Sequence, residues 1–266
     1  MRSPILLLSL MVLAAAPVFS QAAPPAKPAE TAVSTQAREN PPLTEGQLLE
    51  RKGDVQMARK LYREAIDSYG SLVRKEPNNW VAWNKMGIAH HQLLQLGAAR
   101  NFYERSVRIN KNYAEAINNL GTIYYAQKNY KKAIRMYEKA LEISPNSASI
   151  YSNLGTAYFA RKKDTEAFAA YRKALELDPE VFEHRSSYGV LLQERSVEDR
   201  ARYHFFLAQA YASSGNLEKS IEYLRKALEE GFKETKKIYE DPAFAELVKT
   251  APFTELMSNP PAVLPR

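Results

Sequence analysis

The chain has 266 residues, of which 45% are hydrophobic and 25% are charged, a composition typical of globular proteins. It contains no Cys, which excludes disulfides, thiolate metal sites, a Cys nucleophile and a lipid-modified Cys. Its net charge of +7 does not indicate nucleic-acid binding, because acidic and basic residues are interleaved and form no long run of one sign.

Residues 1–22 have the pattern of a secretory signal peptide. Arg2 supplies positive charge, an apolar run covers residues 5–16, and small residues follow at Val18, Ser20 and Ala22. Cleavage after Ser20 and cleavage after Ala22 both fit this pattern. An uncleaved membrane anchor is the alternative, but the apolar run is shorter than the roughly 20 residues that a span needs. We therefore expect an exported, periplasmic or secreted protein whose mature chain has no membrane span.

Residues 23–43 predict a linker. The segment is rich in Pro and Ala, with Thr, Ser and Glu between them, and it offers few side chains to bury. We expect it to be disordered or extended and to separate the export signal from the folded part.

A repeat of 34 residues follows the linker. Its columns are Gly87, Gly121, Gly155 and Gly189; Ala65, Ala99, Ala133 and Ala167; Tyr69, Tyr103, Tyr137 and Tyr171; and Pro77, Pro145 and Pro179, a column that Lys111 interrupts. Each unit contains two stretches of apolar residues at helical spacing with a short polar turn between them, which predicts a helical hairpin. One hairpin cannot bury both of its faces, so neighbouring hairpins are expected to stack.

Each column has a physical reason. Gly and Ala let two helix backbones approach closely, and we expect the Tyr column to fill the space that the next hairpin leaves. Pro after the second helix ends that helix, because the Pro ring clashes with the preceding turn and Pro lacks an amide donor.

The order of these residues resembles the tetratricopeptide repeat. The two units that match its pattern most closely read Leu120, Gly121, Tyr124, Ala133, Tyr137, Ala140, Pro145 and Tyr151, Leu154, Gly155, Tyr158, Ala167, Tyr171, Ala174, Pro179. The resemblance covers roughly residues 46–231. It implies an all-α fold, an α-solenoid of stacked helical hairpins that forms a superhelix. Two short amphipathic segments after Gly231 are expected to close its open end as capping helices.

The repeat divides the chain into segments. In chain order they are a degenerate first unit at 44–79, units at 80–113, 114–147 and 148–181, an irregular insert at 182–199, a fifth unit at 200–232, capping helices at 233–258 and a frayed tail at 259–266. The insert puts the fifth unit about 19 residues out of step. Two roles for the insert stay open, an extra helix that bridges two sub-stacks and a loop that reaches a partner.

The sequence predicts no catalytic residue, no metal site and no cofactor. Only 4 His are present, and the adjacent His90 and His91 point to different faces of a helix. Gly-rich phosphate loops and a nucleophile elbow are both missing. We therefore expect a protein that is not an enzyme.

The resemblance further implies that the first helix of each hairpin lines a groove for a protein or peptide. The residues in those positions are Asn84, Lys85, Ile88 and His91, then Asn118, Asn119, Thr122 and Tyr125, then Ser152, Asn153, Thr156 and Phe159. Asn can donate to and accept from an extended peptide backbone, and the aromatic residues would offer an apolar floor. The alternative is that these residues serve solubility and helix packing alone. A chaperone-type carboxylate clamp is not expected, because the column that needs Asn holds Ile88, Thr122 and Thr156.

Two functions are consistent with these sequence features. The first is a scaffold or adaptor that binds a protein or peptide partner in its groove outside the cytoplasm. The second is a self-associating factor, or an assembly factor of an envelope complex in secretion, pilus or outer-membrane biogenesis, that docks through the insert and the C-terminal caps. Neither function involves nucleic acid.

Overall fold

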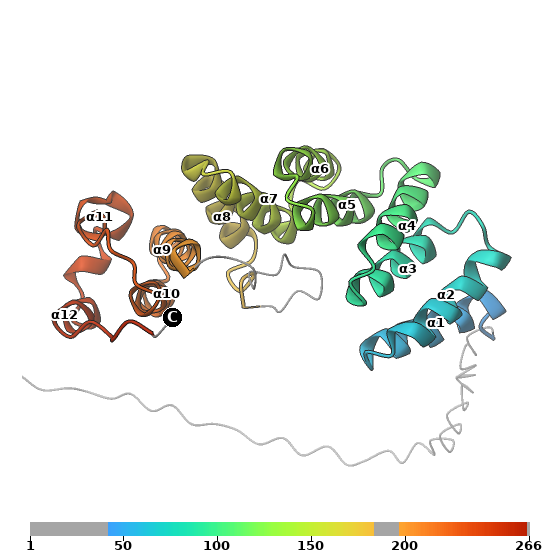
Figure 1. Cartoon of the computed structure of the whole chain (residues 1–266), viewed down its shortest axis with the longest axis horizontal. Coiled ribbons are helices and arrows are strands. Elements are labelled where there is room, and N and C mark those ends of the chain that lie inside the picture. The colour runs from blue at the N-terminus through green and yellow to red at the C-terminus, as the bar shows by residue number, and fades with distance from the viewer. Residues whose placement is uncertain (1–41, 184–196, 265–266) are drawn as a thin grey trace, which may run out of the picture. The chain divides into compact units, whose positions relative to one another are not determined.

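The computed structural model describes residues 42–183 and 197–264, and the regular elements in these two ranges are helices (Figure 1). Four hairpins occupy the first range: α1 (Glu45–Ala58) with α2 (Tyr62–Lys75), α3 (Trp80–Gln92) with α4 (Leu96–Ile109), α5 (Ala114–Ala126) with α6 (Tyr130–Ile143), and α7 (Ala148–Ala160) with α8 (Asp164–Leu177). The second range holds α9 (Val197–Ser213), α10 (Leu217–Glu229), α11 (Lys236–Glu240), the 3-10 helices η2 (Pro242–Phe244) and η3 (Leu247–Lys249), and α12 (Ala251–Ser258). The predicted leader, nearly all of the linker and most of the predicted insert lie outside the described residues.

Successive hairpins stack through their second helices. α2 packs against α3, α4 against α5, α6 against α7 and α8 against α9, while the first helices α3, α5 and α7 also touch one another in sequence. The first helix of an internal unit is thus flanked by its own second helix and by the second helix of the preceding unit. This arrangement confirms the predicted fold class of stacked helical hairpins.

The Gly column makes room for the Tyr column of the same hairpin. A Cβ atom added to Gly121 would lie 2.5 Å from Cε1 of Tyr137, and one added to Gly87 would lie 2.6 Å from Cε1 of Tyr103. The Tyr137 and Tyr103 side chains are completely buried. Each ring lies against the Gly of its own hairpin, because no other residue leaves room for it there. The expected packing towards the next hairpin is also present, since Tyr69 clusters with Ala89 of α3 and Tyr171 packs on Tyr203 of α9.

The fifth hairpin fills the same position with a different pair. Ala208 occupies the Gly column and Leu224 the Tyr column, and both are completely buried. In the Ala column, the Ser220 hydroxyl donates to the Ala208 carbonyl oxygen at 2.8 Å. A branched aliphatic side chain is smaller than a Tyr ring, so the methyl group of Ala208 is accommodated.

The turn between the two helices of each hairpin contains one residue in the left-handed region. Its φ is +59° at Lys60, +58° at Leu94, +59° at Lys128 and +56° at Lys162, and Gly215 takes the corresponding place in the fifth hairpin with φ +83°. Residues other than Gly pay a steric cost of roughly 1–2 kcal/mol in this conformation. The first four turns therefore carry strain that the fifth avoids.

Lys128→Gly is accordingly expected to stabilise the chain by about 0.5–1 kcal/mol, because the relief of steric strain exceeds the extra entropy of Gly in the unfolded state. Urea unfolding followed by circular dichroism measures the change. Lys139→Gly, at an exposed position inside α6, is the matched control and should destabilise by about 1 kcal/mol. Equal loss of stability in both variants would show that Lys128 is unstrained.

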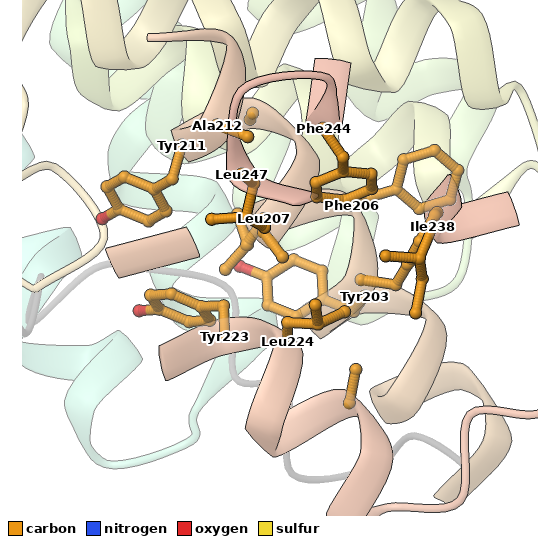
Figure 2. Close-up of a cluster of buried hydrophobic side chains, with 14 of the residues drawn as sticks. Tyr203, Phe206, Leu207, Tyr211, Ala212, Tyr223, Leu224, Ile238, Phe244 and Leu247 are labelled. Carbon is orange, nitrogen blue, oxygen red and sulfur yellow. The ribbon is translucent and has the colours of Figure 1, made fainter. Parts of the chain in front are cut away.

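The C-terminal elements cover the outer side of the fifth hairpin. Ile238, Phe244 and Leu247 are completely buried, and Figure 2 shows them gathered around Leu207 and Leu224. α12 and η3 both contact α10, and η2 contacts α9. The short helices therefore close this end of the array, which is the role predicted for them.

Candidate functional site

A ladder of polar side chains connects the first helices, and each of its hydrogen bonds joins residues 35 positions apart. Its rungs run from Lys85 Nζ to Glu50 Oε1 (2.8 Å), from Asn119 Nδ2 to Asn84 Oδ1 (3.0 Å) and from Asn153 Nδ2 to Asn118 Oδ1 (3.0 Å). Each rung joins the first helix of one hairpin to the first helix of the preceding hairpin. The ladder therefore crosses every boundary between units from α1 to α7.

The Asn side chains of this ladder are buried. Asn84 is 0% exposed, Asn119 is 3% exposed, and Asn118 and Asn153 are each 8% exposed. Their amides bond one another, and Asn84 also donates to Glu115 Oε1 at 2.9 Å. In the free protein the amide groups of these Asn side chains thus form their hydrogen bonds within the stack of hairpins.

Other predicted groove residues are buried as well. Thr122 and Thr156 accept hydrogen bonds from the hydroxyl groups of Tyr137 and Tyr171, at 3.4 and 3.3 Å. Phe159 is buried against Tyr203 and Phe206 of α9, with ring centroids 5.9 and 5.6 Å away. The two Thr side chains thus bond the second helix of their own hairpin, and Phe159 packs on the next hairpin, at positions where the sequence suggested a binding surface.

Four predicted residues keep more solvent exposure: Lys85, His91, Tyr125 and Ser152 are half-buried. Burial lowers the pKa of His91, so its imidazole is neutral at pH 7 and offers one donor and one acceptor rather than a charge. The ring of Tyr125 packs on Tyr130 with centroids 5.1 Å apart.

A cavity of about 420 Å³ lies against the first three hairpins. Its lining comes from α1, α2, α3, α5 and the first hairpin turn, and consists of Asp54, Met57, Ala58, Lys60, Tyr62, Tyr69, Lys85, Ile88, Gln92 and Glu115. Lys85 and Ile88 were predicted as groove residues, whereas Asp54, Met57 and Glu115 were not. The repeat interval could have identified Asp54 and Met57, because they stand 34 residues before the predicted groove residues Ile88 and His91. The first unit was interpreted only as a degenerate repeat.

Ionic hydrogen bonds organise the wall of this cavity. Lys85 Nζ lies 2.8 Å from both Glu50 Oε1 and Asp54 Oδ1. Burial acts to lower the pKa of Lys85, but the hydrogen bonds and charges of Asp54 and Glu50 outweigh it and raise the pKa above its usual value. Glu115 accepts hydrogen bonds from Tyr113 and Asn84. Two carboxylates, those of Glu50 and Asp54, thus pair with the ammonium group of Lys85, while Glu115 is held by Asn84 and Tyr113.

The described residues contain no group of three or more His, Cys, Asp or Glu side chains arranged to hold a metal ion. Within residues 42–183 and 197–264, none of the helices has the length and hydrophobicity needed to span a bilayer.

The stacked hairpins and the 34-residue interval of the first four units define a helical repeat protein. One model of the tetratricopeptide repeat matches residues 82–146 and 112–180, and a second such model matches residues 201–230. The chain is a tetratricopeptide repeat protein, a class of scaffolds that are generally not enzymes.

Several solved structures are similar to this one. Residues 41 to the end of MamA from Desulfovibrio magneticus RS-1 are 22% identical, covering 69% of this chain and 93% of that one with a TM-score of 0.49. YrrB, a TPR protein with an unusual peptide-binding site, is 17% identical over 72% of this chain and 89% of its own, with a TM-score of 0.46. The first TPR of Spaghetti (RPAP3), bound to the HSP90 peptide SRMEEVD, is 26% identical over 44% of this chain and 95% of its own, with a TM-score of 0.43. No curated protein matches the chain.

Proposed function

We propose that this protein is a non-enzymatic scaffold that binds a segment of a partner polypeptide on its first-helix face, outside the cytoplasm. The cavity of about 420 Å³ against α1, α3 and α5 carries the proposal. Its volume lies in the lower part of the range typical of ligand sites. The partner is a protein or peptide, because the repeat fold presents an elongated surface rather than a closed pocket.

The lining of the cavity suits a polypeptide. Met57 and Ile88 supply an apolar floor, and the Met side chain is flexible enough to adapt to different partner side chains. Gln92 can donate to and accept from a peptide backbone, while Asp54 and Glu115 accept from its amide groups or from a basic side chain. Binding therefore combines one buried apolar anchor with a few polar contacts.

The buried Asn ladder serves a different purpose in this proposal. Because Asn84, Asn119 and Asn153 bond side chains of adjacent first helices, they hold these helices at a fixed spacing. A groove that is preorganised in this way loses less conformational entropy when it binds. The rungs thus position the surface that Lys85, His91 and Gln92 present.

The test uses a matched pair of blocking variants. Ala58 and Ala126 are exposed residues at the ends of α1 and α5 in the same repeat column, but only Ala58 lines the cavity. A photo-crosslinking residue at Gln92 in the tagged chain should capture a defined partner segment, identified by mass spectrometry of the crosslinked peptide. Ala58→Trp should lower the yield at least fivefold, and Ala126→Trp should leave it unchanged. Equal yields from the two variants would rule out this cavity as the binding site.

The location is tested separately. The signal-peptide pattern of residues 1–22 supports export. The intact mass of the purified chain should correspond to an N-terminus at Gln21 or Ala23, and cell fractionation should place the chain outside the cytoplasm. A cytoplasmic chain that retains Met1 would contradict the proposed location while leaving the groove proposal intact.

A further inference from the structure

One side of α1 is exposed to solvent, whereas the equivalent side of α3, α5 and α7 is buried. In units two to four the residues in the columns of Leu48 and Val55 are between 0% and 4% exposed: Ala82, Ala116 and Ile150 in the first column, and Ala89, Ile123 and Ala157 in the second. The second helix of the preceding hairpin packs against each of these helices, and in α3 both Ala82 and Ala89 cluster with buried residues of α2. In α1, Leu48 is 53% exposed and Val55 is 44% exposed. The described residues contain no hairpin before α1 that could cover them.

The open face carries positive charge between and beside its apolar residues. Arg51 and Lys52 are exposed at helical spacing from Leu48 and Val55 and share one side of α1 with them, and Arg59 follows on the same side at the C-cap. None of the three basic side chains forms an ion pair with a described residue. The acidic residues of α1 are engaged elsewhere, since Glu45 pairs with Lys75, and Glu50 and Asp54 pair with Lys85.

We propose that this face docks an acidic amphipathic helix of a partner protein, seated where the preceding second helix lies in the internal units. Leu48 and Val55 would receive apolar side chains spaced three, four or seven residues apart on that helix. Asp and Glu residues beside its apolar stripe would meet Arg51, Lys52 and Arg59. Such a helix extends the array by one layer and leaves the groove cavity free.

A second copy of this chain fits the face poorly. Two α1 helices that pair antiparallel, with Leu48 of each against Val55 of the other, would bring the Arg51–Lys52 segments of both copies together at the centre. Like charges in contact disfavour that pairing. End-to-end stacking is blocked as well, because α12 and η3 cover α10, the last second helix.

The absence of Cys from the natural chain makes a direct test simple. In the full-length Leu48→Cys variant, maleimide labelling should be fast and independent of protein concentration. The probes are two helix-stapled peptides copied from residues 130–143, the second helix of the third unit. One keeps the natural sequence, and the other carries Lys131→Glu, Lys132→Glu, Arg135→Glu and Lys139→Glu.

The acidic peptide should slow labelling at position 48 at least tenfold, whereas the natural, basic peptide should not. Labelling of Ala169→Cys, at an exposed position on α8, should respond to neither peptide, and adding Lys52→Glu to the Leu48→Cys variant should weaken protection by the acidic one. Slow labelling in the free chain would mean that residues 1–41 cover the face. Labelling that slows as protein concentration rises would indicate a second copy. Either result, or equal protection by both peptides, or protection by neither, would overturn the proposal.

Discussion

Gly121→Ala is expected to destabilise the array by about 2–3 kcal/mol. The added methyl group would lie 2.5, 2.7 and 3.0 Å from three ring atoms of Tyr137, a completely buried side chain that cannot swing into solvent. The ring or the α5 backbone must shift, and either movement disturbs the contacts that α5 and α6 make with neighbouring hairpins. Urea unfolding followed by helical circular dichroism measures the loss.

Gly97→Ala is the control for this variant. Gly97 also lies in a helix, α4, but a Cβ atom there would meet no atom within 4 Å. Because Ala has a higher helix propensity, the control should be more stable than the natural chain by about 0.5–1 kcal/mol. A loss of stability in both variants would show that the contact with Tyr137 is not the cause.

The fifth hairpin predicts how the damage can be repaired. Since Ala208 is accommodated opposite Leu224, the double variant Gly121→Ala/Tyr137→Leu recreates a pair that the chain already uses. The double variant should lose at least about 1 kcal/mol less stability than the sum of the losses of the two single variants. Strictly additive losses would mean that the fifth hairpin accommodates Ala208 by a backbone shift rather than by the smaller side chain.

The repeat could be predicted from the sequence because its information is local and periodic. Gly121, Ala133 and Tyr137 recur at one interval, and the helices that carry them follow from apolar spacing and turn residues. The position of the Tyr ring was predicted in part. Packing on the next hairpin was expected and is present, as Tyr171 shows against Tyr203, but the contact with the Gly of the same hairpin was not foreseen.

The candidate site was harder to predict because it depends on pairs between columns. The sequence places Asn84 and Asn119 in adjacent columns of successive units, yet only the stacking offset of the helices brings their amides together. The cavity could not be predicted from the sequence for a related reason. Glu50 and Asp54 belong to the degenerate first unit, and departure from the repeat pattern indicates a cap as readily as it indicates a specialised surface.

Asn84→Ala separates the two roles that the sequence left open for the Asn residues. Asn84 is 0% exposed, accepts from Asn119 and donates to Glu115. Its loss leaves a buried amide without its acceptor, so the free energy of unfolding should fall by about 2–3 kcal/mol. Ser152→Ala changes the same column where the side chain is half-buried, and should cost less than about 0.5 kcal/mol.

A double-mutant cycle completes this test. If Asn84 and Asn119 act mainly on each other, the Asn84→Ala/Asn119→Ala variant should lose about 1 kcal/mol less than the sum of the single losses. Partner capture at Gln92, measured where each variant remains folded, should then change little. The opposite pattern, full stability with lost capture, would mean that the Asn side chains leave the ladder to bind the partner. In that case the groove would extend from the cavity along α5 to α7.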